Sequence, residues 1–202
     1  MIRIVSEAIA KWLEMEGTVS SEDRTLYAYA AYCFLFGTLP IGIVMLLGAC
    51  FGMLQEGIVL IIPFMMLRKF CGGFHLKSSG ICFFATIGVL TFSLGLVTYT
   101  IHAEQMGVLT VLVCLSVLSL CIFSPIENQV RKLSERERIV FRTAARILSL
   151  IFLAIYFYLS FHASIRYSAA FGVGILLVGV LQIPCILRKS LFQKLKVETK
   201  GK

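Results

Sequence analysis

The chain is a series of apolar runs separated by short polar interruptions. Most of the runs are long enough for a helix to cross a hydrocarbon core of about 30 Å. The predicted membrane segments are residues 26–50, 58–67, 81–101, 106–123, 147–161 and 167–187. The pattern therefore predicts an all-α integral membrane protein with about six membrane helical segments.

The segment 58–67 is short for a full crossing and contains Pro63. It is tilted, broken, or extended backward through residues 51–54, and the pattern leaves these alternatives open. A broken helix in a membrane is tolerated only where protein or a wet cavity satisfies its backbone. The short segment therefore points to a cavity beside the polar stretch that follows it.

Before the first run, residues 1–16 show apolar and charged positions at helical spacing. The apolar residues are Ile2, Val5, Ile9, Trp12 and Leu13, and the charged residues are Arg3, Glu7, Lys11 and Glu14. Two interpretations stand side by side: an amphipathic helix in the membrane interface, or a helix packed on the rest of the protein. The order of a cleaved signal peptide is missing, so we expect membrane entry to depend on internal segments.

Composition supports the membrane class, because 58% of the residues are hydrophobic and 15% are charged. The formal net charge of +8 does not indicate nucleic acid, because the basic residues cluster at 68–77, in a predicted loop 124–146 and in a predicted tail 188–202. Six crossings with cytosolic termini place all three clusters on one side, as the positive-inside rule requires. We expect one membrane domain over residues 1–202.

Seven cysteines raise the question of disulfides. Most of them lie inside apolar runs without regular spacing, and Cys71 and Cys82 fall on the predicted cytosolic face. Reduced thiols are therefore expected.

The stretch 68–82 is the polar interruption whose residues are best suited to catalysis. It holds His75, one of three histidines, and it ends at Cys82 where the next apolar run begins. A thiol and an imidazole suffice for nucleophilic acyl transfer, since the thiolate attacks a carbonyl and the imidazole moves the proton.

Two conformations bring this pair together. With Ser79 as the cap of the next helix, Cys82 lies in the first turn and His75 in the preceding loop. With an earlier helix start, the two share a face but lie about 10 Å apart along the axis. We favour the loop and helix arrangement, since Gly72 and Gly73 allow unusual backbone angles or a close approach to a ligand.

The pattern of Arg68, Gly72-Gly73, His75 and, seven residues later, Cys82 resembles the AgrB family of membrane-embedded cysteine endopeptidases, which mature quorum-sensing pro-peptides in Gram-positive bacteria. The opening of the basic loop, Ser124-Pro125-Ile126-Glu127-Asn128, is similar to that family's proline- and asparagine-containing loop. Length, hydropathy and the order of spans also match.

The resemblance implies roles for individual residues. Cys82 stands at the position of the nucleophile and His75 at that of the general base, while Arg68 and Gly73 match positions that matter for activity. It also implies a protein of the bacterial cell membrane and a homodimer. The positive-inside rule places the active-site stretch on the cytosolic side. No cofactor and no metal are implied.

The implied substrate is an AgrD-like pro-peptide. The enzyme removes its acidic C-terminal segment and cyclises the remainder to a thiolactone or lactone. We expect the basic residues of the loop to attract the acidic segment; they are Arg131, Lys132, Arg136 and Arg138.

Alternatives remain at the level of the sequence. A third catalytic group is open among Glu127, Asn128 and a backbone carbonyl. Zinc is disfavoured, because the cysteines and His75 lack a fourth ligand and paired spacing. The main functional alternative is a small peptide transporter with helices broken at prolines, although the predicted spans hold almost no charge.

Overall fold

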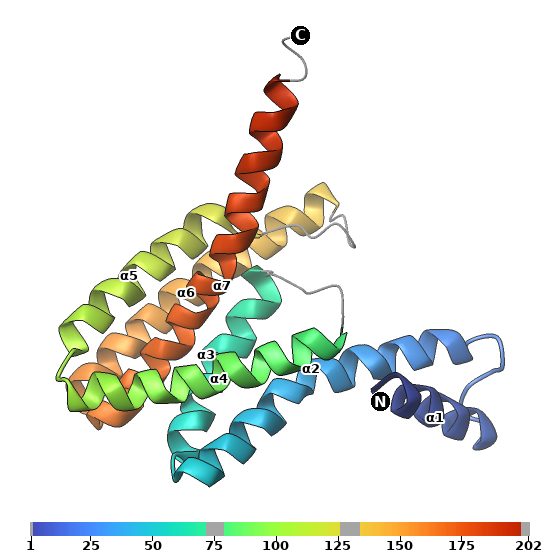
Figure 1. The fold of residues 1–202 in the computed structure, drawn as a ribbon. Helices are drawn as coiled ribbons and strands as arrows, with labels where there is room; N and C mark the ends of the chain where they lie inside the picture. The colour runs from blue at the N-terminus through green and yellow to red at the C-terminus, as the bar shows by residue number, and fades with distance from the viewer. Residues whose placement is uncertain (1, 72–78, 126–133, 199–202) are drawn as a thin grey trace. The chain divides into compact units, whose positions relative to one another are not determined.

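The structure is a computed structural model that describes residues 2–71, 79–125 and 134–198. In these residues the chain forms seven helices and no strand (Figure 1). The helices are α1 (Ile2–Met15), α2 (Arg24–Phe51), α3 (Leu54–Cys71), α4 (Ser79–His102), α5 (Met106–Phe123), α6 (Glu135–His162) and α7 (Ile165–Glu198).

Five of these helices, namely α2, α4, α5, α6 and α7, are long and apolar enough to cross a membrane. The predicted class, an all-α integral membrane protein, is confirmed. The apolar helix α3 is not among the five and carries Glu56, Arg68 and Lys69. It is one continuous helix with Pro63 inside it, so the short segment is extended at both ends rather than broken.

The chain divides into two compact units, Met1–Ile43 and Val44–Lys202. In the first unit, Glu14 of α1 forms a 3.5 Å ion pair with Arg24 at the start of α2. Ala10 is fully buried, whereas Trp12 is mostly exposed. Part of the apolar surface of α1 is thus covered by protein and part is free.

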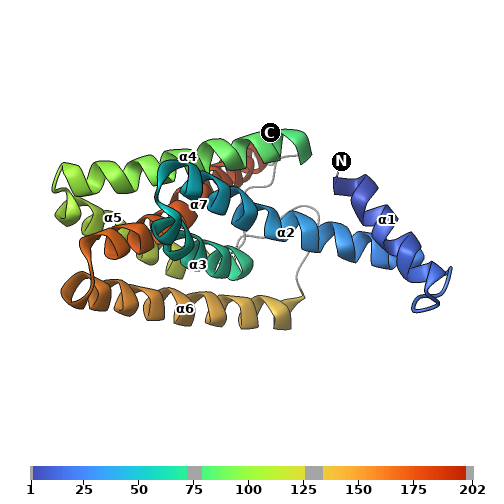
Figure 2. The same ribbon diagram turned by 90° about the horizontal axis from the view of Figure 1, so that it is seen from below.

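In the second unit, the apolar part of α7 is the central element, in contact with α3, α4, α5 and α6 (Figure 2). Two glycines permit the close approach. A Cβ at Gly174 would collide with the backbone carbonyl of Leu60, and a Cβ at Gly179 would lie 2.7 Å from the Cβ of Ser116.

The predicted loop 124–146 is wrong in its second half, because α6 begins at Glu135. Ser134 caps this helix: its hydroxyl accepts from the Glu137 N–H, and the Glu137 side chain accepts from the Ser134 N–H. This reciprocal capping box starts a helix at a polar residue. The apolar run that predicts the membrane segment begins at residue 147, and α6 begins twelve residues earlier, at Glu135.

The predicted tail 188–202 is likewise helical as far as Glu198, because α7 continues beyond the apolar run. The other ends agree with the sequence more closely. The span expected at 106–123 has the same bounds as α5, and that expected at 81–101 lies within α4.

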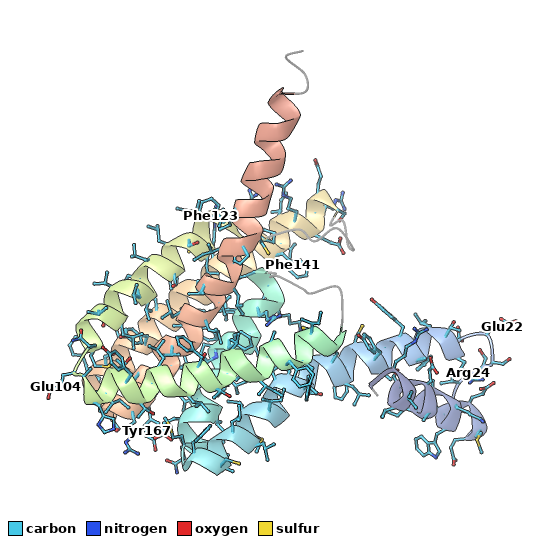
Figure 3. The ribbon with its side chains drawn as sticks, viewed as in Figure 1. Glu22, Arg24, Glu104, Phe123, Phe141 and Tyr167 are labelled. Carbon is cyan, nitrogen blue, oxygen red and sulfur yellow. The ribbon has the colours of Figure 1, made fainter. Side chains whose placement is uncertain are left out.

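The helices of the second unit run between two ends. At one end, α3 finishes, α4 begins, α5 finishes and α6 begins. At the other lie the turns after α2, α4 and α6. Figure 3 labels Phe123 and Phe141 at the first end and Glu104 and Tyr167 at the second. We call them the Cys82 end and the Glu56 end.

Candidate functional site

The structure brings together two of the predicted site residues at the Cys82 end. Arg68 lies in the last turn of α3, and Cys82 lies near the start of α4. The two side chains interact electrostatically; burial lowers the pKa of Arg68, and the interaction with Cys82 opposes that effect. The Arg68 guanidinium also lies 5.4 Å from the centre of the Phe64 ring, a distance typical of a cation–π contact.

Cys82 is buried, with 8% of its surface exposed. The helix is already formed at Ser79, so Ser79 is not the residue that precedes it. The carbonyl of Cys82 accepts a 2.8 Å hydrogen bond from the Thr86 hydroxyl one turn later. The thiol therefore lies on a regular helix, near the half-buried Arg68.

A chain of buried polar groups fixes the end of α3 next to this site. The Gln182 amide on α7 donates a 2.9 Å hydrogen bond to the Ser124 hydroxyl, and the Ser124 side chain is hydrogen-bonded to the Cys71 thiol. Burial raises the pKa of Cys71, and the bond to Ser124 partly offsets that effect. Cys71 is one turn from Arg68, so these contacts hold the turn that carries Arg68.

Helix α6 closes the same end of the bundle. Arg146 donates a 3.0 Å hydrogen bond to the Cys121 carbonyl on α5. The ring of Phe141 lies 5.9 Å from that of Phe70 on α3. The start of α6 is thereby fixed against the ends of α3 and α5.

The other predicted site residues lie outside the described residues. They are Gly72, Gly73, His75, Arg131 and Lys132. The approach of His75 to Cys82 therefore stays a prediction, and only the placement of Ser79 as the cap differs from the structure, where Ser79 is helical. The same applies to Glu127 and Asn128 as orienting groups.

In the described ranges, no three His, Cys, Asp or Glu residues are grouped to hold a metal ion. The seven cysteines all lie in the described ranges and form no disulfide there. His162 lies at the Glu56 end, with its ring 4.9 Å from that of Tyr158. His102 ends α4, also at the Glu56 end.

Sequence reasoning missed four buried or paired polar residues, namely Ser124 and Gln182 at the Cys82 end and Glu56 and Arg166 at the Glu56 end. Gln182 is the only strongly polar residue between Leu176 and Leu187. An isolated polar side chain within a membrane segment indicates a buried polar partner, so the sequence did carry a signal for Gln182. Its partner could not be read from the sequence.

Five apolar helices and a buried thiol with a half-buried arginine nearby define the class: an all-α integral membrane protein with a cysteine-containing candidate site. The family model described as accessory gene regulator B matches residues 6–185. The chain belongs to the accessory gene regulator B family, AgrB.

A curated relative supports this assignment. The chain is 29% identical over 82 residues to a Clostridium perfringens (strain 13 / Type A) protein named "Putative AgrB-like protein 2". That match covers 41% of this chain and 38% of the relative. No solved structure matches the chain.

Proposed function

We propose that the protein is a membrane cysteine endopeptidase that cleaves an AgrD-like pro-peptide and cyclises the remaining peptide for quorum sensing. The observation that carries the proposal is Arg68 beside Cys82 in a member of the AgrB family. A guanidinium next to a cysteine favours the thiolate, which is the nucleophilic form of the side chain. The proposed site is therefore one in which Cys82 is the nucleophile and Arg68 stabilises its charge.

The reaction proceeds in two balanced steps. The Cys82 sulfur attacks a peptide carbonyl, the C–N bond breaks, and His75 returns the thiol proton to the leaving amine. The N-terminal part of the precursor then remains on Cys82 as a thioester. A hydroxyl or thiol of that same peptide attacks the thioester, closes the ring and restores the Cys82 thiol.

Cyclisation requires that water does not reach the acyl-enzyme, because hydrolysis would give a linear product. The burial of Cys82 on a helix of the membrane class supports this requirement. We further propose that the Cys82 end faces the cytosol, since the basic residues at the start of α6 belong to it.

The test is the mass of the product formed when the full-length protein in liposomes meets a pro-peptide encoded beside its gene. Wild type is expected to release the C-terminal segment and to give a product one water lighter than the linear peptide. Cys82→Ala and His75→Ala are expected to give neither. Cys114→Ala, a cysteine change within α5, is the matched control and is expected to behave as wild type.

Processing by Cys82→Ala at the wild-type rate would overturn the proposal. In that case the alternative of a peptide transporter gains weight, and uptake of the labelled pro-peptide by the same liposomes measures it directly.

A further inference from the structure

A pocket of about 770 Å³ lies at the Glu56 end of the bundle. Its walls come from the α2–α3 turn, from one face of the second half of α4 and from the start of α7, including Met53, Leu94 and Tyr99. This volume is within the range of small-molecule sites in proteins, about 300–1,000 Å³. The pocket is separate from the candidate site at Cys82, from which Thr98 is sixteen residues, or about 24 Å, along α4.

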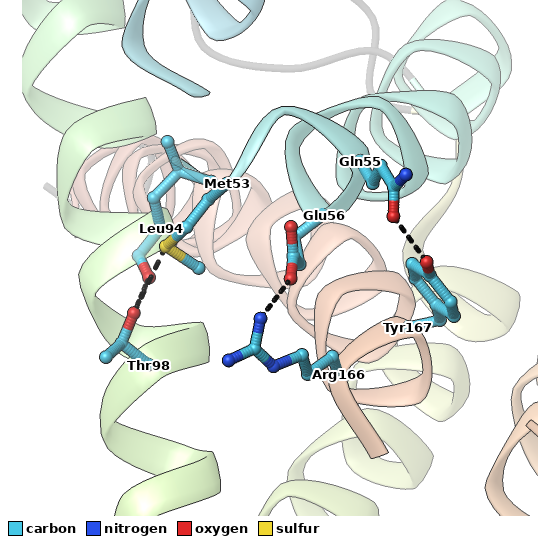
Figure 4. Close-up of polar contacts among 7 residues, drawn as sticks. All are labelled: Met53, Gln55, Glu56, Leu94, Thr98, Arg166 and Tyr167. Carbon is cyan, nitrogen blue, oxygen red and sulfur yellow. Dashed lines mark hydrogen bonds and ion pairs between the residues drawn. The ribbon is translucent and has the colours of Figure 1, made fainter. Parts of the chain in front are cut away.

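One wall of the pocket holds a buried charge. The Glu56 side chain is 7% exposed, and its Oε1 pairs with Nη1 of Arg166 at 3.4 Å (Figure 4). Charge-assisted hydrogen bonds are normally about 2.7–2.9 Å, so this pair is long. Glu56 lies in the first turn of α3, where the helix dipole favours an anion, yet a buried carboxylate needs stronger compensation than this single contact.

Arg166 is available to a second partner. Its side chain is 65% exposed, and the ion pair with Glu56 engages one of its nitrogens. The neighbouring Tyr167 is anchored separately, since its hydroxyl donates a 2.5 Å hydrogen bond to the Gln55 Oε1. The pocket therefore presents one anion and one cation side by side at its polar end.

The rest of the lining is mostly apolar, although Thr91, Thr98 and His102 also belong to it. Leu94, Ile101 and Phe51 contribute to its lining, and the α4 wall belongs to a candidate membrane span. Tyr99, another wall residue, is exposed on that helix. A ligand from the hydrocarbon layer can thus reach the pocket laterally, with its polar group at the membrane surface.

We propose that this pocket binds a phospholipid whose head group carries a primary ammonium. The ammonium donates hydrogen bonds to Glu56, the phosphate accepts from Arg166, and an acyl chain follows the apolar wall along α4. A zwitterionic head matches the paired charges, and a primary ammonium has three N–H donors where a quaternary one has none. The inference does not depend on the proposed peptidase activity.

The experiment measures lipid retention by the purified full-length protein using native mass spectrometry. The probes are phosphatidylethanolamine, phosphatidylcholine and phosphatidylglycerol with identical acyl chains. We expect phosphatidylethanolamine to be retained about tenfold more strongly than either of the others, as the loss of a charged hydrogen bond predicts. Equal retention of the three lipids, or preference for one of the other two, overturns the proposal.

Two matched glycine variants test whether the lipid binds in this pocket. A Cβ added at Gly95, in the pocket wall, meets no atom within 4 Å, and the same holds for Gly88, two turns earlier on α4 and outside the lining. Gly95→Leu fills the pocket and is expected to abolish the preference for phosphatidylethanolamine, whereas Gly88→Leu is expected to preserve it. The same preference in both variants contradicts the assignment.

A second variant tests the head-group contact. Glu56→Gln removes the charge and keeps the size of the side chain, so phosphatidylethanolamine and phosphatidylcholine are expected to be retained equally. A preference that survives in Glu56→Gln excludes Glu56 as the ammonium partner. Because Gly95→Leu leaves Glu56 intact, the proposal remains testable even if Glu56→Gln does not fold.

Discussion

At the scale of single residues, the candidate site depends on a cation that is held from several directions. Arg68 lies over the Phe64 ring and interacts with Cys82, while Cys71, one turn later, is tied to Ser124. The guanidinium thus lies at the end of α3 and the thiol at the start of α4. The sequence predicted both residues, because their spacing from His75 resembles a family pattern.

Arg68→Gln is expected to lower the rate of pro-peptide cleavage by about tenfold or more, because it removes the positive charge that interacts with the proposed nucleophile. Alkylation of Cys82 by iodoacetamide, followed at the level of the peptide, is expected to slow in parallel. Lys69→Gln is the control, since Lys69 is exposed and has its ammonium 5.9 Å from the Phe70 ring. Equal rates in the two variants would remove Arg68 from the site.

The bond between Ser124 and Gln182 gives a second prediction. Ser124→Ala leaves the Gln182 amide without an acceptor in a buried position, which costs about 1–3 kcal/mol. The double variant Ser124→Ala/Gln182→Leu removes both partners and is expected to regain much of that loss. Unfolding midpoints of the two single variants and the double variant measure the coupling, and strict additivity would mean that the bond contributes nothing.

This pair also marks a limit of the sequence at the residue scale. Ser124 and Gln182 are 58 positions apart, and nothing in either local pattern selects the other. Glu56 and Arg166 are 110 positions apart and are subject to the same limit. Such pairs arise from tertiary packing, which hydropathy and spacing do not encode.

At the scale of elements, apolar runs predicted which segments are helical, whereas capping by polar residues determines where a helix such as α6 begins. The run at 147–161 located the membrane part of α6, but the helix begins at Glu135. The signal was present as Ser134-Glu135-Arg136-Glu137, a serine followed three residues later by glutamate. Charged residues are compatible with helix and with loop, so composition alone placed the boundary too late.

Close helix packing in the second unit supplies the element-scale prediction. Gly174→Ala places a methyl group against the Leu60 backbone carbonyl and 2.8 Å from the Pro63 ring. Backbone cannot move aside as a flexible side chain can, so the free energy of unfolding is expected to fall by about 1–3 kcal/mol. Gly88→Ala, whose Cβ meets open space, is the matched control. A similar unfolding midpoint in the two variants would show that α3 and α7 adjust at no cost.

At the scale of the whole molecule, basic residues lie at the same end of the second unit as the candidate site. Arg136 and Arg138 lie in the first turns of α6, at the same end of the second unit as Cys82. The sequence predicted this grouping through the positive-inside rule, and the connectivity of the helices confirms that these residues share an end. His75 lies outside the described residues, so its place at this end stays a prediction.

Electrostatic attraction between this end and an acidic leaving segment is testable by binding. Neutral replacement of Arg131, Lys132, Arg136 and Arg138 by glutamine is expected to weaken pro-peptide binding at low salt. The difference should shrink as salt rises, because the Debye length falls from about 30 Å at 0.01 M to about 8 Å at 0.15 M. Arg166→Gln removes a charge at the Glu56 end and serves as the control. Unchanged binding at low salt in the fourfold variant contradicts the attraction.

The most direct test of the central claim is the intact mass of the protein after a brief reaction with its pro-peptide and an acid quench. The account predicts an adduct equal to the acyl part of the N-terminal fragment, sensitive to hydroxylamine, located on the Cys82 peptide and missing in Cys82→Ala. Cleavage of the pro-peptide without such an adduct, or an adduct that persists in Cys82→Ala, would contradict a Cys82 acyl-enzyme.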